Sequence, residues 1–150
     1  MSLDEIVIYY SRFYEVIRVE KTAVIVDDTI FMRMTLKNIL ENIGYRILGE
    51  GADGIDAVKL YKKHKPLIIT MDITMPNKDG IEAVQEILSF DQKANVIMVS
   101  AMGQKTKVID ALTAGAKDFV VKPFQHDRIL AALTRIEEQL SPDQSKKETE

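Results

Sequence analysis

Short runs of β-branched residues alternate with amphipathic segments over most of the chain. The runs, too brief for helices, are expected to be five buried strands at residues 23–26, 45–48, 67–69, 96–99 and 119–121. Each is followed by apolar residues at helical spacing, and two of these helices should end at Gly44 and Gly115. Five strands joined to five helices by short connections predict a doubly wound α/β fold, with a parallel sheet covered by helices on both faces.

The chain divides into three predicted segments. Its 150 residues correspond to about one domain, which we place at residues 21–140. Residues 141–150 contain no apolar side chain and are predicted to be a disordered polar tail. Residues 1–20 form an N-terminal extension.

The extension has its own periodicity. Leu3, Ile6, Tyr10, Phe13 and Ile17 are spaced alternately by three and four, which predicts an amphipathic helix before the first strand. We favour a helix packed on its own domain, with a docking or dimer element as the alternative. A short strand over residues 6–10 is also open, because β-branched and aromatic residues dominate there.

Composition excludes several classes of site. The chain has no cysteine and two histidines, which excludes disulfides, a thiolate nucleophile and Cys-based zinc or iron–sulfur centres. A net charge of −3 argues against nucleic acid as a direct partner. There is neither a long apolar run nor a basic region before the early apolar residues, so we expect no membrane span and no signal peptide, and a cytoplasmic protein.

Polar residues gather where the predicted strands end. Asp27 and Asp28 follow the first strand, Asp72 the third, Ser100 the fourth and Lys122 the fifth. In an open parallel sheet these ends meet at one edge, where ligands bind. Three carboxylates there would repel one another unless a hard cation neutralised them, which favours Mg²⁺, with Mn²⁺ as a substitute. An Asp carboxylate can attack phosphorus, and Lys122 and Ser100 could position the transferred group.

Four segments carry a family resemblance. They are VIVDD (24–28), MDITMPNKDG (71–80), VSAMG (99–103) and GAKDFVVKPF (115–124). In this order the chain resembles the receiver domain of two-component response regulators across residues 21–139. The resemblance implies a flavodoxin-like strand order of 2-1-3-4-5. It also implies a phosphoacceptor signalling protein with at most weak autophosphatase activity, not an enzyme.

The resemblance assigns roles to the strand-end residues. Asp72 would be the phosphoryl acceptor, and Asp27, Asp28, Asp72 and the backbone carbonyl of Thr74 would hold Mg²⁺. Lys122 would pair with the phosphoryl oxygens, and its bond to Pro123 is expected to be cis.

Two further pairs of residues receive roles by the same resemblance. Ser100 would hydrogen-bond a phosphoryl oxygen and be drawn inward, while Phe119 fills the vacated space. Many relatives carry Tyr at the position of Phe119, and Phe lacks the tyrosine hydroxyl. Thr74 and Met102 would modulate hydrolysis of the acyl phosphate, and we hypothesise that the bulky Met102 shields it.

The leading function is a single-domain response regulator of the chemotaxis type, whose output is a binding surface. The implied partners are a chemotaxis-type sensor histidine kinase, a flagellar motor switch or adaptor protein and a possible phosphatase, for a monomer or weak dimer. The alternative is a phosphorelay intermediate that passes phosphate to a histidine phosphotransferase. A phosphohydrolase of the haloacid dehalogenase type would want a second Asp where Thr74 stands. A receiver-like binding module without phosphorylation usually lacks an acidic residue or the lysine, and none is missing.

Overall fold

Five parallel strands form one sheet in the order β2-β1-β3-β4-β5, which confirms the order implied by the resemblance. The computed structural model describes residues 1–17 and 20–140, and residues 13–17 by their backbone alone. The strands are β1 (Thr22–Val26), β2 (Arg46–Gly51), β3 (Ile68–Asp72), β4 (Val96–Ser100) and β5 (Asp118–Val121). The helices are α1 (Leu3–Ile17), α2 (Ile30–Ile43), α3 (Gly54–His64), α4 (Gly80–Phe90), α5 (Lys105–Ala114) and α6 (His126–Gln139).

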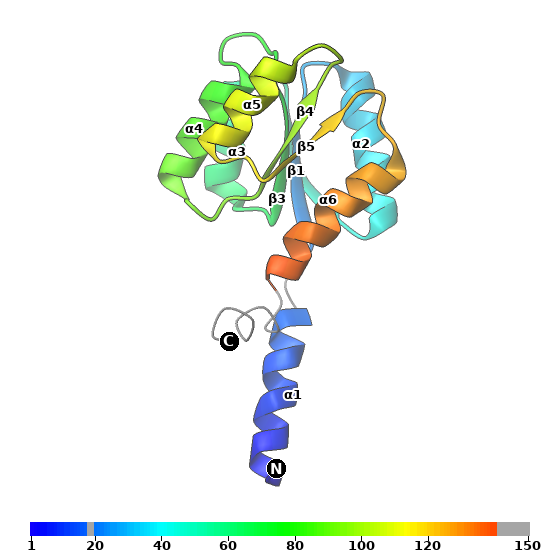
Figure 1. The fold of residues 1–150 in the computed structure, drawn as a ribbon, viewed down its shortest axis with the longest axis vertical. Helices are drawn as coiled ribbons and strands as arrows, with labels where there is room; N and C mark the ends of the chain where they lie inside the picture. The colour runs from blue at the N-terminus through cyan, green and yellow to red at the C-terminus, as the bar shows by residue number, and fades with distance from the viewer. Residues whose placement is uncertain (18–19, 141–150) are drawn as a thin grey trace.

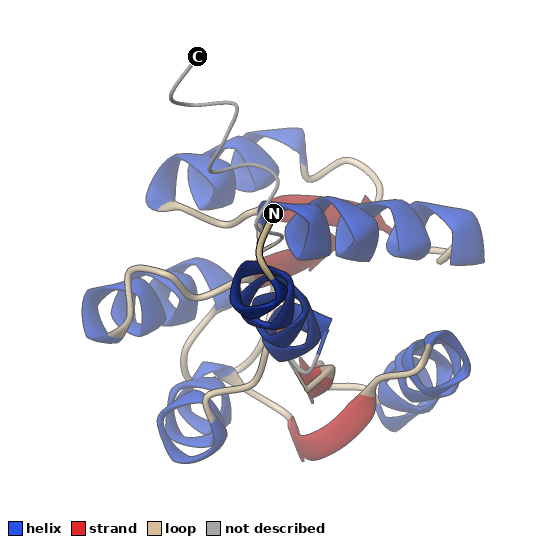
Figure 2. Cartoon of the chain, turned by 90° about the horizontal axis from the view of Figure 1, so that it is seen from below, coloured by secondary structure: helices blue, strands red, loops and turns tan. Residues whose placement is uncertain are grey.

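Helices cover both faces of the sheet, as Figures 1 and 2 show. Alternate residues of β1 point to opposite faces, so Ala23 and Ile25 pack against α2 and α6, whereas Val24 and Val26 pack against α3, α4 and α5. Burying a large aliphatic side chain such as Ile25 contributes about 2 kcal/mol. The central strands are therefore packed between two hydrophobic cores, which hold the carboxyl ends of these strands in place.

Several helices begin or end at capping residues that the sequence contains. Gly44 and Gly115 both adopt left-handed backbone conformations, with φ of 114° and 118°, and end α2 and α5 as predicted. Asp53 and Asp79 cap the N-termini of α3 and α4, since their carboxylates accept hydrogen bonds from Asp56 N and Glu82 N, each at 2.8 Å. These caps position the loops that follow β2 and β3.

One strand differs from the prediction. The strand at residues 45–48 was expected to be buried, but β2 spans Arg46–Gly51 and is mostly half-buried or exposed. It pairs only with β1 and therefore forms an edge of the sheet. An edge strand has one side open to solvent, which explains the lower burial.

The N-terminal extension is helical, so the strand alternative for residues 6–10 is wrong. α1 extends away from the layered body in Figure 1, contrary to our favoured interpretation of a helix packed on its own domain. Leu3 is 81% exposed, and Val7 and Tyr10 are more than half exposed. The amphipathic spacing predicted the helix but did not specify what its apolar side chains contact. A docking or dimer role stays a prediction, and the predicted tail at 141–150 lies outside the described residues.

Within the described residues, no helix has the length and hydrophobicity needed to cross a membrane.

Candidate functional site

Three carboxylates meet at the carboxyl edge of the sheet. Asp27 and Asp28 follow β1, and Asp72 is the last residue of β3, the strand next to β1. Each offers an oxygen within 4.8 Å of the others. Asp27 is fully buried and Asp72 is 6% exposed, while Asp28 is open to solvent. The strand order reverses between β1 and β3. Ligands bind at such a reversal, at the carboxyl ends of the strands, in open α/β sheets.

Lys122, which follows β5, supplies a positive charge to the cluster. Its Nζ lies 2.9 Å from Asp27 Oδ2 and 3.5 Å from Asp72 Oδ2. Burial alone would lower the pKa of Lys122, but its hydrogen bond to Asp27 and the charge of Asp72 raise that pKa above its ordinary value. The ammonium group is therefore charged, and one cation faces three carboxylates.

The charge imbalance is greatest at Asp72. Burial, followed by repulsion from Asp27, raises the pKa of Asp72 to about 6, although Lys122 opposes the shift. A carboxylate held in this way is stabilised by an added cation. The donor set, oxygen atoms alone with two of three carboxylates buried, suits a hard divalent ion such as Mg²⁺.

The raised pKa predicts a pH-dependent effect of Asp72→Asn on the metal-free protein. A group whose pKa is raised on folding adds stability below its unfolded pKa and loses it as the pH rises through the folded value. Asn cannot ionise, so between about pH 4 and pH 7.5 the variant should gain roughly 2 kcal/mol relative to wild type. Urea unfolding in EDTA at several pH values measures this, with exposed Asp110→Asn as the control. Parallel stability profiles for wild type and Asp72→Asn would contradict the prediction.

Two residues that sequence reasoning missed hold Asp27 in place. Thr29 donates from its backbone N and its Oγ1 to Asp27 Oδ1, at 2.9 and 2.6 Å. Arg33 Nη1 donates to the carbonyl oxygen of Asp27 at 2.7 Å, and its Nε lies 3.5 Å from Glu50 Oε1. The hydroxyl two residues after Asp27 was a usable signal, since Thr and Asp commonly form such turns. Arg33 left no comparable local signal.

The predicted hydroxyl and loop residues occupy the neighbouring strand ends. Ser100, the last residue of β4, is 1% exposed, and its carbonyl accepts a hydrogen bond from Lys122 N at 2.8 Å. The Lys122–Pro123 peptide bond is cis, as the resemblance implied. Thr74 is exposed, and its Oγ1 accepts a hydrogen bond from Gln104 Nε2 at 2.8 Å. The sheet thus brings Ser100 and Lys122 to the edge that carries the carboxylates.

An apolar groove of about 300 Å³ lies beside this edge, between the start of α5 and β5. It is lined by Ser100, Met102, Gln104, Val108, Ile109 and Phe119, among others. Met102 is 80% exposed, so it lies open on the groove wall in this structure. Its proposed shielding of an acyl phosphate stays a prediction.

Phe119 is held by Arg128 from α6. Arg128 Nη2 donates to Asp118 Oδ1 at 2.7 Å and to the carbonyl oxygen of Phe119 at 2.6 Å. Its guanidinium carbon lies 5.7 Å from the centroid of the Phe119 ring, within the range of a cation–π contact. A half-buried ring without a hydroxyl is thereby positioned by a cation.

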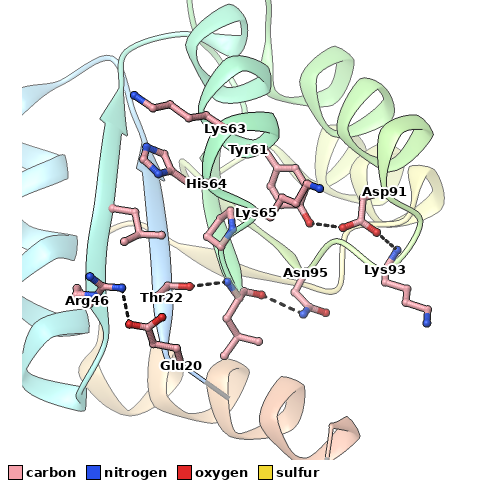
Figure 3. Close-up of a pocket in the computed structure, with 13 residues that line it drawn as sticks. Glu20, Thr22, Arg46, Tyr61, Lys63, His64, Lys65, Asp91, Lys93 and Asn95 are labelled. Carbon is pink, nitrogen blue, oxygen red and sulfur yellow. Dashed lines mark hydrogen bonds and ion pairs between the residues drawn. The ribbon is translucent and has the colours of Figure 1, made fainter. Parts of the chain in front are cut away.

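A second cavity, of about 580 Å³, lies at the opposite edge of the sheet (Figure 3). Several of its polar side chains are paired: Tyr61 Oη donates to Asp91 Oδ2 at 2.7 Å, and Arg46 forms an ion pair with Glu20. Thr22 Oγ1 accepts a hydrogen bond from Leu67 N at 3.0 Å. These pairs tie strands to loops and leave the carboxyl edge as the better candidate site.

Comparison with known proteins agrees with this geometry. The family model of the response regulator receiver domain matches residues 23–134. The chain is 53% identical to Chemotaxis protein CheY of Thermotoga maritima, over 77% of this chain and 97% of that protein. It is 55% identical to Chemotaxis protein CheY of Bacillus subtilis, over 74% and 92%.

A solved structure is similar as well. A chain in the crystal structure of the CheX-CheY-BeF3-Mg+2 complex from Borrelia burgdorferi superposes with a TM-score of 0.73 at 41% identity, over 77% of this chain and 87% of that one. The strand order, the acidic edge with its lysine and the family match over most of the chain lead to one conclusion. The protein belongs to the response regulator receiver domain family.

Proposed function

We propose that this protein is a single-domain response regulator that accepts a phosphoryl group from a histidine kinase on Asp72 and thereby changes a binding surface. The single observation that carries the proposal is the cluster of Asp27, Asp28 and Asp72 within 4.8 Å, with Lys122 Nζ 2.9 Å from one carboxylate and 3.5 Å from another. A nucleophilic carboxylate, charged groups and an open mouth are what phosphoryl transfer to an aspartate needs.

Mg²⁺ fits the donor set, and Asp27, Asp28, Asp72 and the Thr74 carbonyl would hold it. When bound, the ion supplies positive charge that offsets the repulsion between the carboxylates and the phosphoryl oxygens. Lys122 contributes a second positive charge from the β5 side, and the buried Asp27 orients it. Thr29 and Arg33 in turn fix Asp27, so the acidic site is held before any phosphoryl group arrives.

In the transfer, an Asp72 carboxylate oxygen forms a bond to phosphorus while the bond from phosphorus to the donor's histidine nitrogen breaks. The imidazole leaves with its electron pair and takes a proton from solvent, which balances the step. Asp72 is ionised at neutral pH even with its pKa raised to about 6, so it can attack. Hydrolysis of the acyl phosphate by the protein itself should be weak.

The output should be of the chemotaxis type. Several relatives that are more than half identical to this chain bear the name Chemotaxis protein CheY, and the Borrelia structure holds a CheX-CheY complex. The partners proposed on this basis are a chemotaxis-type histidine kinase, a flagellar motor switch or adaptor protein and a phosphatase. The groove beside Phe119 is the surface that such a partner would read.

The test is phosphorylation by a small donor. Incubation of the full chain with Mg²⁺ and acetyl phosphate should add one phosphoryl group, detected by intact mass spectrometry as an acid-stable, base-labile adduct. Asp72→Asn should gain none, nor should wild type in EDTA, because the nucleophile or the neutralising cation is missing. Wild type that gains no phosphate, or Asp72→Asn that gains as much as wild type, would overturn the proposed function.

A further inference from the structure

The side chain of Gln104 joins the loop that follows β3 to the loop that follows β4. Its Nε2 donates a hydrogen bond to Thr74 Oγ1 at 2.8 Å, and its Oε1 accepts one from Ala101 N at 2.8 Å. Thr74 lies two residues beyond Asp72, and Ala101 directly follows Ser100. One neutral amide therefore links the loop that leaves β3 to the loop that leaves β4.

Gln104 is also the residue from which α5 begins. It occupies the N-cap position, but its side chain does not cap the helix, because it reaches back to the two loops. Its backbone carbonyl accepts a hydrogen bond from Val108 N at 3.0 Å, in the first turn of α5. A displacement of the Gln104 side chain would therefore act directly on the start of that helix.

The first turn of α5 forms one wall of the apolar groove. Val108 and Ile109 line the groove together with Phe119, and Gln104 and Ser100 belong to the same lining. Gln104 is half-buried. The same residue thus contacts Thr74, two residues beyond Asp72, and lines the groove that would change.

We propose that Gln104 is a positioning residue that holds the loops after β3 and β4 together in the unphosphorylated protein and is displaced when Asp72 carries a phosphoryl group. The inference rests on the proposed function. Phosphoryl oxygens are charged acceptors, and charge-assisted hydrogen bonds are stronger than those of a neutral amide. Ala101 N donates to Gln104 Oε1, so a phosphoryl group at the strand edge competes with Gln104 for this donor. Release of the amide frees the start of α5 and reshapes the groove.

The test compares amide NMR spectra of the full chain with Mg²⁺, before and after beryllofluoride is added as a phosphoryl mimic. In wild type, beryllofluoride should shift the resonances of Ala101, Gln104 and the first turn of α5. Gln104→Leu cannot bridge the loops, so without beryllofluoride its α5 resonances should already lie more than half of the way to the wild-type beryllofluoride positions. With beryllofluoride the two proteins should coincide.

Two further variants separate this role from general loop stability. Thr74→Val removes the other end of the bridge and should shift the same resonances, and the double variant should shift them no further. Gln104→Glu retains the acceptor for Ala101 N and can accept from the Thr74 hydroxyl, which reverses that hydrogen bond but keeps the bridge, so its free spectrum should stay at the wild-type position. Its negative charge should raise the beryllofluoride concentration needed for the change. Gln92→Leu, an exposed glutamine in the turn before β4, is the matched control.

The outcomes distinguish the two proposals. If wild type responds to beryllofluoride but the free spectrum of Gln104→Leu stays at the wild-type position, the role of Gln104 is wrong and the proposed function stands. The role of Gln104 would also be wrong if Gln104→Leu differed from wild type by equal shifts in the free and the beryllofluoride-bound forms, because this would indicate a structural effect alone. If wild type itself does not respond, the proposed function fails and the inference fails with it.

Discussion

Replacing Lys122 with methionine is expected to make the stability of this protein depend more strongly on Mg²⁺ than that of wild type. The Asp27 side chain is 1% exposed, and Lys122 lies 2.9 Å away on one side of it. Removing one partner of a buried ion pair leaves an uncompensated charge, which costs roughly 3 kcal/mol or more. In EDTA, Lys122→Met should therefore unfold at a lower urea concentration than wild type by about that free energy.

Mg²⁺ should restore most of the loss, because a cation among the three carboxylates replaces the missing charge. A ligand at 100 times its dissociation constant stabilises the folded state by about 2.7 kcal/mol. The exposed Lys117→Met is the control and should gain no more stability from Mg²⁺ than wild type does. The rate of phosphate gain from acetyl phosphate should fall by about 100-fold in Lys122→Met, a typical cost of removing one charge-stabilising group. Equal stability of the variant in EDTA and in Mg²⁺ would show that Lys122 does not compensate Asp27.

Gly80→Ala is expected to destabilise the folded protein strongly. A Cβ at Gly80 would lie 2.1 Å from the carbonyl oxygen of Asp72, and Gly80 N donates a hydrogen bond to the Ile73 carbonyl oxygen at 2.8 Å. The colliding atom is backbone at the end of β3, so it cannot rotate away, and the start of α4 must move instead. We expect a loss of roughly 3 kcal/mol or more in the free energy of unfolding.

Gly103→Ala adds the same methyl group in open space and is the matched comparison. Gly103 has φ of 85°, and a Cβ there would meet no atom within 4 Å, so only the cost of a left-handed backbone applies, about 1 kcal/mol. Chemical unfolding followed by circular dichroism measures both. If the two variants lose the same stability, the close approach of α4 to Asp72 is not what requires glycine at position 80.

The sequence predicted the parts of this structure that have local signals. Strand runs and helical spacing gave the order of elements, and the positions of Asp27, Asp72, Ser100 and Lys122 at strand ends brought them to one edge of the sheet. Each of these predictions depends on residues close together in the chain. The parallel sheet then places the strand ends side by side without further information.

The remaining parts depend on contacts between distant segments. β2 was expected to be buried because its run of residues resembles the others, but burial depends on its place at the edge of the sheet. The bridge from Gln104 to Thr74 joins residues 30 positions apart, and no periodicity marks it. The helical spacing of residues 3–17 identified α1 but contained nothing about its contacts. Such features become visible only when the loops and helices are placed in space.

Phe119 lines the groove beside the edge of the sheet that carries the carboxylates. Its ring has no polar atom and lies against Arg128, whose guanidinium is tied to Asp118 and to the Phe119 carbonyl. A tyrosine at this position could form a directional hydrogen bond with a partner through its hydroxyl. A phenylalanine has no such group, so a partner can distinguish its positions only by the volume that the ring occupies or vacates. Recognition of this surface must therefore depend on its shape.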